Sequence, residues 1–357
     1  MKPTTVSELL DFVNGKTRLT PCGAKSKTSL HNRGNEVDEV VLTGISGMIE
    51  YDPDEYTFTA LAGTPLEECN QALSEQGQYL PFDPLFTDQG ATIGGTVASN
   101  MSGPGRYRFG GIRDFIIGVQ YVDGHGNLIR SGGKVVKNAA GFDLSKLMVG
   151  SLGSYGALIE CSFKVFPKPE VNTTLQVGFD SMEEALERLV AVTKLPLDIS
   201  AVELIPQYDR NLLVIRLGGR AENLNARIER LAIVLGEGEI YEGDEEAQIW
   251  HDFGEFNWVP NSDVLVKIPL TPKHVLELDK RLSDPFVRRQ YSVGCNLAWV
   301  SWQKPVDDLD SHLNILDLSG LVITGQVDNP RLGVKRHNSF SVKVKEALDP
   351  LNKWVEV

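Results

Sequence analysis

The sequence predicts an α+β protein of two domains followed by a C-terminal helix. At 357 residues the chain is too long for one ordinary hydrophobic core. Sixteen of its 34 glycines lie between positions 90 and 156, which marks the first half as rich in turns. Near residue 170 short strands and turns give way to longer strands and helices. We therefore expect domains at residues 1–169 and 170–335, and a terminal helix within 336–357.

The composition is that of a globular protein. Hydrophobic residues make up 41% and charged residues 23%, which excludes a disordered or fibrous chain. No stretch has the roughly 18 uncharged apolar residues of a membrane span, and the first residues carry acids instead of a signal peptide's apolar core. The four cysteines, at positions 22, 69, 161 and 295, form no CxxC pair. This predicts a cytoplasmic, reduced protein with no metal site and no iron–sulfur ligands of its own.

Net charge argues against one class of function. The formal charge is −13, whereas a nucleic-acid-binding protein needs a broad basic face. Between Gly90 and Pro169 the balance reverses, with nine basic residues against four acidic ones. A local positive segment suits a single anionic cofactor or substrate. A chance run of solvated lysines and arginines explains it equally well.

The elements of the first domain are predicted from their end signals. Residues 64–77 predict a helix with Thr64 as its N-cap and Gly77 just beyond its end. Residues 115–130, FIIGVQYVDGHGNLIR, predict a β-hairpin whose turn is DGHG.

From residue 171 the predicted order is strand, helix, two strands, helix. The corresponding runs are TTLQVGF, SMEEALERLVAVTKL, ISAVELI, NLLVIRL and AENLNARIERLAIVLG. This order is typical of a ferredoxin-like α+β unit, with its helices on one face of an antiparallel sheet. Ser181 and Glu184 predict a capping box at the first helix. Strands VLVKIPL, NLAWVSW and LVITGQ follow, then the terminal helix VKVKEALDPLNKW, and the residues show no internal repeat.

Two glycine-rich segments carry the main functional signal. TPCGAKSKTS, residues 20–29, can aim consecutive backbone amides at an anion. GATIGGTVASNMSGPGRYRFGGIRD, residues 90–114, combines glycines for close approach with hydroxyl and amide side chains. Neither contains the GKS or GKT of a nucleotide-triphosphate loop or the G-x-G-x-x-G of a nicotinamide-binding fold. Taken alone, either segment could equally have a structural role.

Longer runs around these segments resemble the vanillyl-alcohol oxidase / p-cresol methylhydroxylase family of flavoproteins. They are GMIEYDPDEYTFTALAGTPLEECNQALSEQGQYLPFDP, GATIGGTVASNMSGPGRYRFGGIRDFIIGV and GGKVVKNAAGFDLSKLMVGSLGSYGALIECSFKVFPKP, together with the Cys22 segment. They cover nearly all of the first 169 residues, and the likeness is thinner beyond. The resemblance implies a p-cresol methylhydroxylase-type FAD-binding fold of two α+β subdomains, followed by a ferredoxin-like cap, with FAD held non-covalently. The chain is similar in particular to the E-type subunits of bacterial glycolate oxidases.

The resemblance also implies roles for individual residues in FAD binding. At the pyrophosphate it places Gly23, Ala24, Lys25, Ser26, Lys27, Gly94, Gly95 and Thr96. At the flavin and its ribityl chain it places Ser99, Asn100, Gly103, Gly110 and Asp114, and along the adenosine part Gly150, Ser151, Gly153, Gly156 and Leu158. Amides from two loops can satisfy a dianionic pyrophosphate without many cations.

Catalytic candidates follow from the chemistry of 2-hydroxy-acid oxidation. The reaction needs a cation for the carboxylate and a base near the hydroxyl group. Arg106, Arg108 and Arg113 lie beside the predicted flavin loop with Tyr107 among them, and an arginine fork matches a carboxylate. We expect Arg108 and Tyr107 to be catalytic.

Two further candidates are a lysine and a histidine. Lys137 lies in a run that the family places near the flavin, where it could stabilise a reduced anion, or it could pair with Asp143 at the surface. Related dehydrogenases carry the metal-binding motif HGxGDGNxH, which is absent here. His251 is the best remaining histidine. The C-terminal ALDPLNKWVEV also departs from the family's FDP…NPGR run.

The resemblance implies an FAD-linked oxidoreductase subunit of a glycolate-oxidase-like complex. A small 2-hydroxy acid would pass hydride to flavin N5, and electrons would leave through an iron–sulfur partner subunit. The alternative is a structural or electron-relay FAD subunit beside a catalytic sister flavoprotein, which the missing histidine motif favours. A third possibility is a flavin reductase with a nicotinamide donor. Expected partners are the sister flavoprotein and iron–sulfur subunits, with no nucleic acid and only indirect membrane association.

Overall fold

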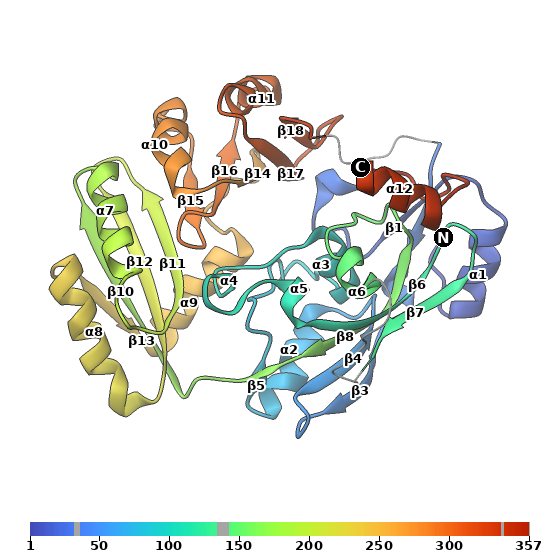
Figure 1. Ribbon diagram of the computed structural model, residues 1–357, viewed down its shortest axis with the longest axis horizontal. Coiled ribbons are helices and arrows are strands. Elements are labelled where there is room, and N and C mark those ends of the chain that lie inside the picture. The colour runs from blue at the N-terminus through green and yellow to red at the C-terminus, as the bar shows by residue number, and fades with distance from the viewer. Residues whose placement is uncertain (32–35, 134–142, 337–338, 357) are drawn as a thin grey trace. The chain divides into compact units, whose positions relative to one another are not determined.

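The computed structural model describes residues 1–31, 36–133, 143–336 and 339–356, and the chain forms two compact units (Figure 1). The first unit comprises Met1–Ser102, Gly111–Lys168 and Arg336–Val357, and the second comprises Gly103–Gly110 and Pro169–Lys335. The C-terminal residues thus group with the first unit. The short segment Gly103–Gly110 groups with the second unit, although the sequence-based boundary assigned it to the first.

A five-stranded antiparallel sheet of order β3-β4-β8-β6-β7 is the centre of the first unit. Its strands are β3 Met48–Asp52, β4 Thr57–Leu61, β6 Ile116–Val122, β7 Leu128–Gly132 and β8 Ala157–Lys164. Smaller sheets pair β1 Leu19–Cys22 with β2 Asp38–Val41 and β5 Gln78–Tyr79 with β9 Phe166–Pro167. The helices are α1 Val6–Asn14, η1 Thr28–Leu30, η2 Leu42–Gly44, α2 Leu66–Glu75, α3 Ile93–Ser99, α5 Ile112–Phe115, α6 Leu144–Met148 and α12 Ser339–Leu348.

The predicted hairpin is confirmed as β6 and β7, and Asp123 closes its turn. The Asp123 carboxylate accepts hydrogen bonds from the amides of His125 and Asn127, at 2.9 and 2.8 Å. The predicted N-cap of α2 is wrong, because that position belongs to Pro65. The Thr64 hydroxyl instead donates to the Leu61 carbonyl at 2.7 Å, which ties the end of β4 to the start of the helix.

The second unit contains one nine-stranded antiparallel sheet of order β13-β10-β12-β11-β15-β16-β14-β17-β18. Its strands are β10 Val171–Phe179, β11 Ile199–Pro206, β12 Asn211–Gly219, β13 Glu239–Glu242, β14 Val264–Pro269, β15 Arg289–Ser292, β16 Leu297–Trp302, β17 Ser319–Thr324 and β18 Arg331–Gly333. Its helices are α4 Arg106–Phe109, α7 Met182–Val192, α8 Ala221–Leu235, α9 Gly243–Glu255, α10 Pro272–Arg281 and α11 Val306–Ile315.

The ferredoxin-like arrangement occurs twice in this sheet, a repeat that the residues themselves do not reveal. The succession β10-α7-β11-β12-α8-β13 has the spatial strand order 4-1-3-2, and β14-α10-β15-β16-α11-β17 has the mirrored order 2-3-1-4. The two halves join where β11 pairs with β15 at Leu204 and Tyr291. Two ferredoxin-like halves therefore share one continuous sheet within the second unit.

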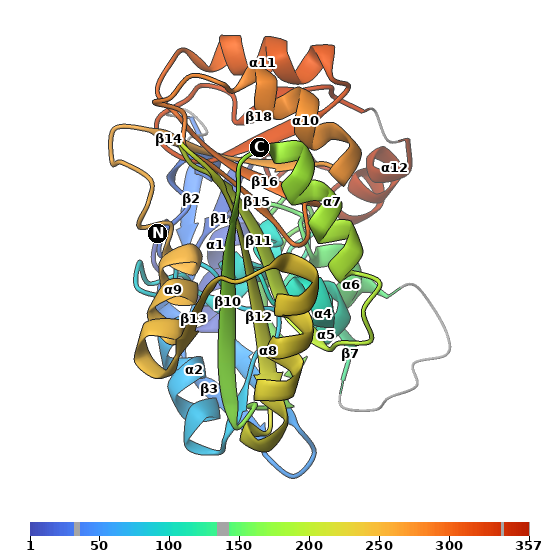
Figure 2. The same ribbon diagram turned by 90° about the vertical axis from the view of Figure 1, so that its left-hand side faces the viewer.

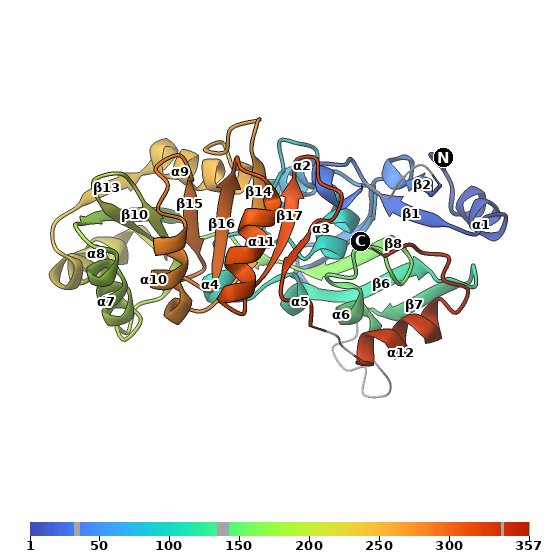
Figure 3. The same cartoon turned by 90° about the horizontal axis from the view of Figure 1, so that it is seen from above.

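Helices cover both faces of the first half of this sheet. Along α8 the buried residues Leu224, Ile228, Leu231 and Leu235 recur at helical spacing and share one core with α7, α10 and α11. Figure 2 shows α7 and α8 on one side of the strands of this half and α9 on the other. Figure 3 shows α10 and α11 along the second half. No helix in the described part of the chain is long and apolar enough to cross a bilayer.

Buried polar contacts fasten α9 to its face of the sheet. Arg216 on β12 forms a two-point ion pair with Glu246, at 2.8 and 3.0 Å. Thr174 on β10 donates to Glu246 at 3.0 Å and accepts from the Trp250 indole at 2.8 Å. Because every member of this network has a partner, the buried carboxylate of Glu246 is compensated.

Candidate functional site

The first unit contains a cleft with about 690 Å³ of empty space, counting its open mouth. Three backbone segments form its walls: the turn 23–27 after β1, the first turns of α3, and the turn 150–156 before β8. Eleven of the sequence-predicted FAD residues line it: Gly23, Ala24, Lys25, Ser26, Lys27, Gly94, Gly95, Ser99, Gly153, Gly156 and Leu158. Segments more than a hundred residues apart in sequence thus meet at one place.

The first wall presents backbone donors that the protein itself does not use. Within the described chain, the amides of Ala24, Lys25 and Ser26 donate no hydrogen bond. Lys25 has a φ of +62°, a left-handed conformation that turns successive amides toward one side. Its ammonium group pairs with Glu39 at 2.6 Å, and this hydrogen bond raises the pKa of Lys25. The wall therefore offers an anion backbone amides, while the charge of Lys25 is neutralised by Glu39.

The second wall allows neighbouring backbone segments to pack closely, and the amides of its two glycines are already hydrogen-bonded within the protein. The Gly94 amide donates to the Ala62 carbonyl at 2.8 Å, and the Gly95 amide donates to the Thr92 hydroxyl at 3.3 Å. A Cβ atom on Gly94 would lie 2.6 Å from the Ala62 Cβ, and one on Gly23 would lie 2.2 Å from the Thr92 hydroxyl oxygen. These glycines let the first wall, α3 and β4 pack together without side chains between them.

The third wall is a turn built from left-handed residues. Gly150, Leu152 and Gly153 have φ values of +80°, +51° and +79°. The amides of Gly150 and Leu152 donate to carbonyls at the end of α3, at 3.0 and 2.8 Å. A Cβ atom on Gly153 would lie 2.6 Å from Pro21 Cγ on β1, the strand that leads into the first wall. The third wall is thus in direct contact with α3 and with the strand that leads into the first wall.

Two orphaned hydroxyl groups support a polar ligand in this region. The side-chain oxygens of Thr96 and Ser151 are buried and have no hydrogen-bond partner within the described chain. A buried hydroxyl without a partner costs about 1–3 kcal/mol. Both residues belong to the set that the sequence predicts for FAD. Neither residue lines the cleft itself, so it is the free amides of the first wall that fit a phosphate-containing cofactor.

The remaining predicted flavin residues have local structural contacts as well. The Ser99 hydroxyl donates to the Gly95 carbonyl at 2.6 Å, and Asn100 ends α3 with a left-handed φ of +51°. The Asp114 carboxylate accepts from the Gly111 amide at 2.8 Å and so caps α5. Gly103 and Gly110 belong to the segment that groups with the second unit. Their predicted contacts with FAD stay predictions.

The catalytic candidates Tyr107 and Arg108 lie on α4, within the second unit. Arg108 contacts Asp198 through both its carbonyl and its carboxylate, at 3.0 and 3.3 Å. Burial raises the pKa of Tyr107, so the phenol stays protonated at neutral pH and can donate a hydrogen bond. His251 is exposed on α9, and Lys137 lies outside the described residues.

A strained turn next to Tyr107 was not found from the sequence. Val293, Gly294 and Cys295, between β15 and β16, all have positive φ, from +56° to +63°. A Cβ atom on Gly294 would lie 2.7 Å from the Tyr107 ring, so the ring packs directly on this backbone. A β-branched valine in this conformation is a genuine outlier. Only the single glycine in SVGCN hinted at the turn.

Comparisons with known proteins are consistent with an FAD-binding function of the first unit. A family model described as an FAD binding domain matches residues 2–132. Glycolate oxidase subunit GlcE of Escherichia coli is 38% identical over 239 residues, which cover 66% of each chain. The chain belongs to the family of FAD-linked oxidoreductases. Its cofactor is FAD.

Two further similarities extend this assignment. Glycolate oxidase subunit GlcD of Bacillus subtilis is 33% identical over 159 residues, 44% of this chain and 32% of that subunit. The solved structure of an alkyldihydroxyacetonephosphate synthase superposes with a TM-score of 0.73 at 15% identity, covering 100% of this chain and 77% of the synthase. The fold is therefore of the expected p-cresol methylhydroxylase type. In sequence, the chain aligns with about two thirds of GlcE and a third of GlcD.

We expect a bulky residue at position 95 to exclude FAD. Gly95 lines the cleft, and a Cβ atom there would meet only the Thr92 hydroxyl oxygen, at 3.1 Å, so the rest of a leucine side chain would extend into the cleft. Gly95→Leu should be purified without the visible flavin spectrum, whereas Gly95→Ala should retain it. Thermal unfolding of both apoproteins controls for folding. Full flavin content in a folded Gly95→Leu variant would show that FAD does not pass Gly95.

Proposed function

We propose that this protein is the FAD-binding subunit of a glycolate-oxidase-like complex that oxidises a small 2-hydroxy acid. The observation that carries the proposal is the cleft, whose first wall offers free backbone amides at the positions that the family uses for FAD. The likeness to GlcE supports the complex and the class of substrate. Bound FAD supplies the acceptor for the hydride of the alcohol carbon.

The substrate would be held by residues of the α4 segment. Contacts with Asp198 orient the Arg108 guanidinium and use only part of its five N–H donors, so it can still take a carboxylate. Tyr107, protonated and supported by the strained 293–295 turn, would donate a hydrogen bond to the substrate. Lys137 and His251 remain secondary candidates for charge stabilisation near the flavin and for the base.

Further subunits complete the proposed assembly. GlcE and GlcD are both named as subunits of glycolate oxidase, which supports a sister flavoprotein beside this chain. An iron–sulfur subunit would then carry the electrons away one at a time. The cytoplasmic location likewise stays a prediction.

A second candidate function is that of an FAD-binding relay or structural subunit. The absent HGxGDGNxH motif and the commitment of Arg108 to Asp198 favour it. In that case the sister flavoprotein performs the oxidation.

An anaerobic visible spectrum of the purified chain distinguishes the two functions. We expect glycolate or D-lactate to bleach the flavin absorbance band of this chain alone, because substrate oxidation reduces the flavin. Succinate, which has no hydroxyl group at the oxidised position, is the control. If neither hydroxy acid changes the flavin absorbance of this chain alone, but the band bleaches once the sister subunit is added, the relay function would be established instead.

Replacing Arg108 tests its proposed role. Loss of a charge-assisted hydrogen bond to the carboxylate should lower kcat/KM by about 10- to 100-fold in Arg108→Ala, and added guanidinium should restore part of it. The matched control is Asp198→Ala, which releases the same ion pair but keeps the guanidinium. Equal losses in both variants, without rescue, would mean that Arg108 only fastens α4.

Acid precipitation tests whether FAD is held non-covalently. Cys22 lies in the cleft, but burial raises the pKa of its thiol to about 11, so the nucleophilic thiolate is scarce at neutral pH. We therefore expect all flavin in the supernatant of the acid-treated protein. Flavin that stays in the precipitate would point to a covalent bond, which Cys22→Ser would then remove if the thiol formed it.

A further inference from the structure

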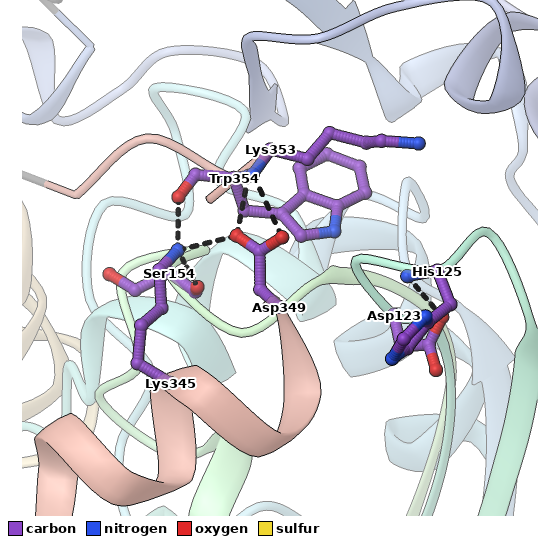
Figure 4. Close-up of polar contacts among 7 residues, drawn as sticks. All are labelled: Asp123, His125, Ser154, Lys345, Asp349, Lys353 and Trp354. Atoms are coloured by element: carbon purple, nitrogen blue, oxygen red, sulfur yellow. Dashed lines mark hydrogen bonds and ion pairs between the residues drawn. The ribbon is translucent and has the colours of Figure 1, made fainter. Parts of the chain in front are cut away.

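The end of the chain forms a buried polar clasp in the first unit (Figure 4). We define the clasp as Lys345 and Asp349 on and after α12, and Lys353 and Trp354 in the following tail. The Lys345 ammonium donates to the Asp349 carboxylate at 2.6 Å and to the Trp354 carbonyl. Asp349 in turn accepts from the amides of Lys353 and Trp354, at 2.8 and 2.7 Å. The tail is thereby folded back onto α12.

The third hydrogen bond of Lys345 is made to a residue outside the clasp. Its ammonium donates to the Ser154 carbonyl at 2.8 Å. Ser154 lies in the turn 150–156, which is the third wall of the FAD cleft. All three N–H donors of this buried lysine are thus occupied, one of them by the wall itself. The left-handed residues of this turn need such outside support, because a strained backbone persists only where its surroundings hold it.

The tail of the clasp also holds the strand that leads into the first wall. Leu19 on β1 donates its amide to the Lys353 carbonyl at 2.8 Å and accepts from the Val355 amide at 2.9 Å. The Trp354 side chain is fully buried in one hydrophobic cluster with Leu19 and Val40. Three residues after Leu19, β1 ends and the turn 23–27 begins.

The clasp packs against the turn of the β6–β7 hairpin. The Gly124 amide donates to the Leu348 carbonyl at 2.8 Å, and a Cβ atom on Gly124 would lie 2.1 Å from an Asp349 carboxylate oxygen. Asp123, beside it, closes the hairpin turn. The Asp349 carboxylate therefore lies directly against backbone, with no room for another side chain.

We propose that Lys345 and Asp349 are positioning residues for FAD, which set the distance between the first and third walls of the cleft. The clasp contacts the third wall at Ser154 and, at Leu19, the strand that leads into the first wall, and none of its residues lines the cleft. A conformation with correctly spaced walls binds FAD, so a contact that favours this conformation also raises the affinity for FAD. By linkage, FAD then stabilises the clasp in return.

The test measures FAD affinity and needs no turnover. Apoprotein of the full-length Lys345→Met variant is titrated with FAD, and binding is followed by quenching of flavin fluorescence. We expect Kd to rise about 10-fold or more, as is usual for coupled sites. The matched control is Lys343→Met, an exposed lysine on the same helix, whose Kd should equal that of the wild type. Hydrogen exchange of a peptide covering residues 150–158 should accelerate in Lys345→Met alone.

A purely structural clasp gives a different result. A lower melting temperature in Lys345→Met, with unchanged Kd and unchanged exchange of residues 150–158, overturns the proposal. Because this variant leaves the Asp349 charge buried without its cation, the double variant Lys345→Met/Asp349→Asn repeats the titration with both charges removed. An unchanged Kd there also overturns the proposal.

The proposal for the clasp and the proposed oxidation can be contradicted independently of each other. A wild-type protein that binds FAD but ignores 2-hydroxy acids contradicts only the proposed substrate, and the Kd comparison remains decisive for the clasp. A wild-type apoprotein that takes up no FAD contradicts both.

Discussion

Close contact between three backbone turns is the constraint on which the first unit depends. Gly23, Gly94 and Gly153 lie where a Cβ atom would come within 2.6 Å of a neighbouring segment, at Thr92, Ala62 and Pro21 respectively. Since no side chain fits at these positions, the segments that carry these glycines pack directly on their neighbours, and the cleft forms between them. Four of the sixteen glycines between positions 90 and 156 line the cleft in this way, namely Gly94, Gly95, Gly153 and Gly156, and each costs conformational entropy on folding.

Backbone amides allow the cleft to bind an anion within an acidic protein. The chain carries a net charge of −13, and the Lys25 ammonium beside the cleft is paired with Glu39. Unused amides of the first wall supply partial positive charge without requiring a cationic side chain. The wall geometry, more than net charge, would then control affinity. That dependence is the reason a clasp at the far end of the chain can matter for FAD.

The second unit is built on one wide sheet that contains the ferredoxin-like arrangement twice. Its two ferredoxin-like halves join through β11 and β15, and the α4 segment packs at this junction, with Arg108 bound to Asp198 and Tyr107 on the 293–295 turn. A segment that lies between flavin-binding motifs in sequence is therefore held by the other unit.

The sequence by itself determined the fold class, the cofactor and the elements with strong local signals, such as the β6–β7 hairpin and the Ser181 cap of α7, whose hydroxyl accepts from the Glu184 amide at 3.1 Å. The cofactor and the FAD-binding fold follow from the resemblance of long runs to a flavoprotein family, whereas the hairpin and the cap follow from turn chemistry and hydrophobic period, which are properties of neighbouring residues. Only the tertiary structure decided that Pro65 replaces Thr64 as the N-cap of α2, that the sheet of the second unit repeats, and that Lys345 reaches Ser154. Each of these depends on residues distant in sequence competing for the same hydrogen bonds or packing space, and local patterns carry no record of that competition.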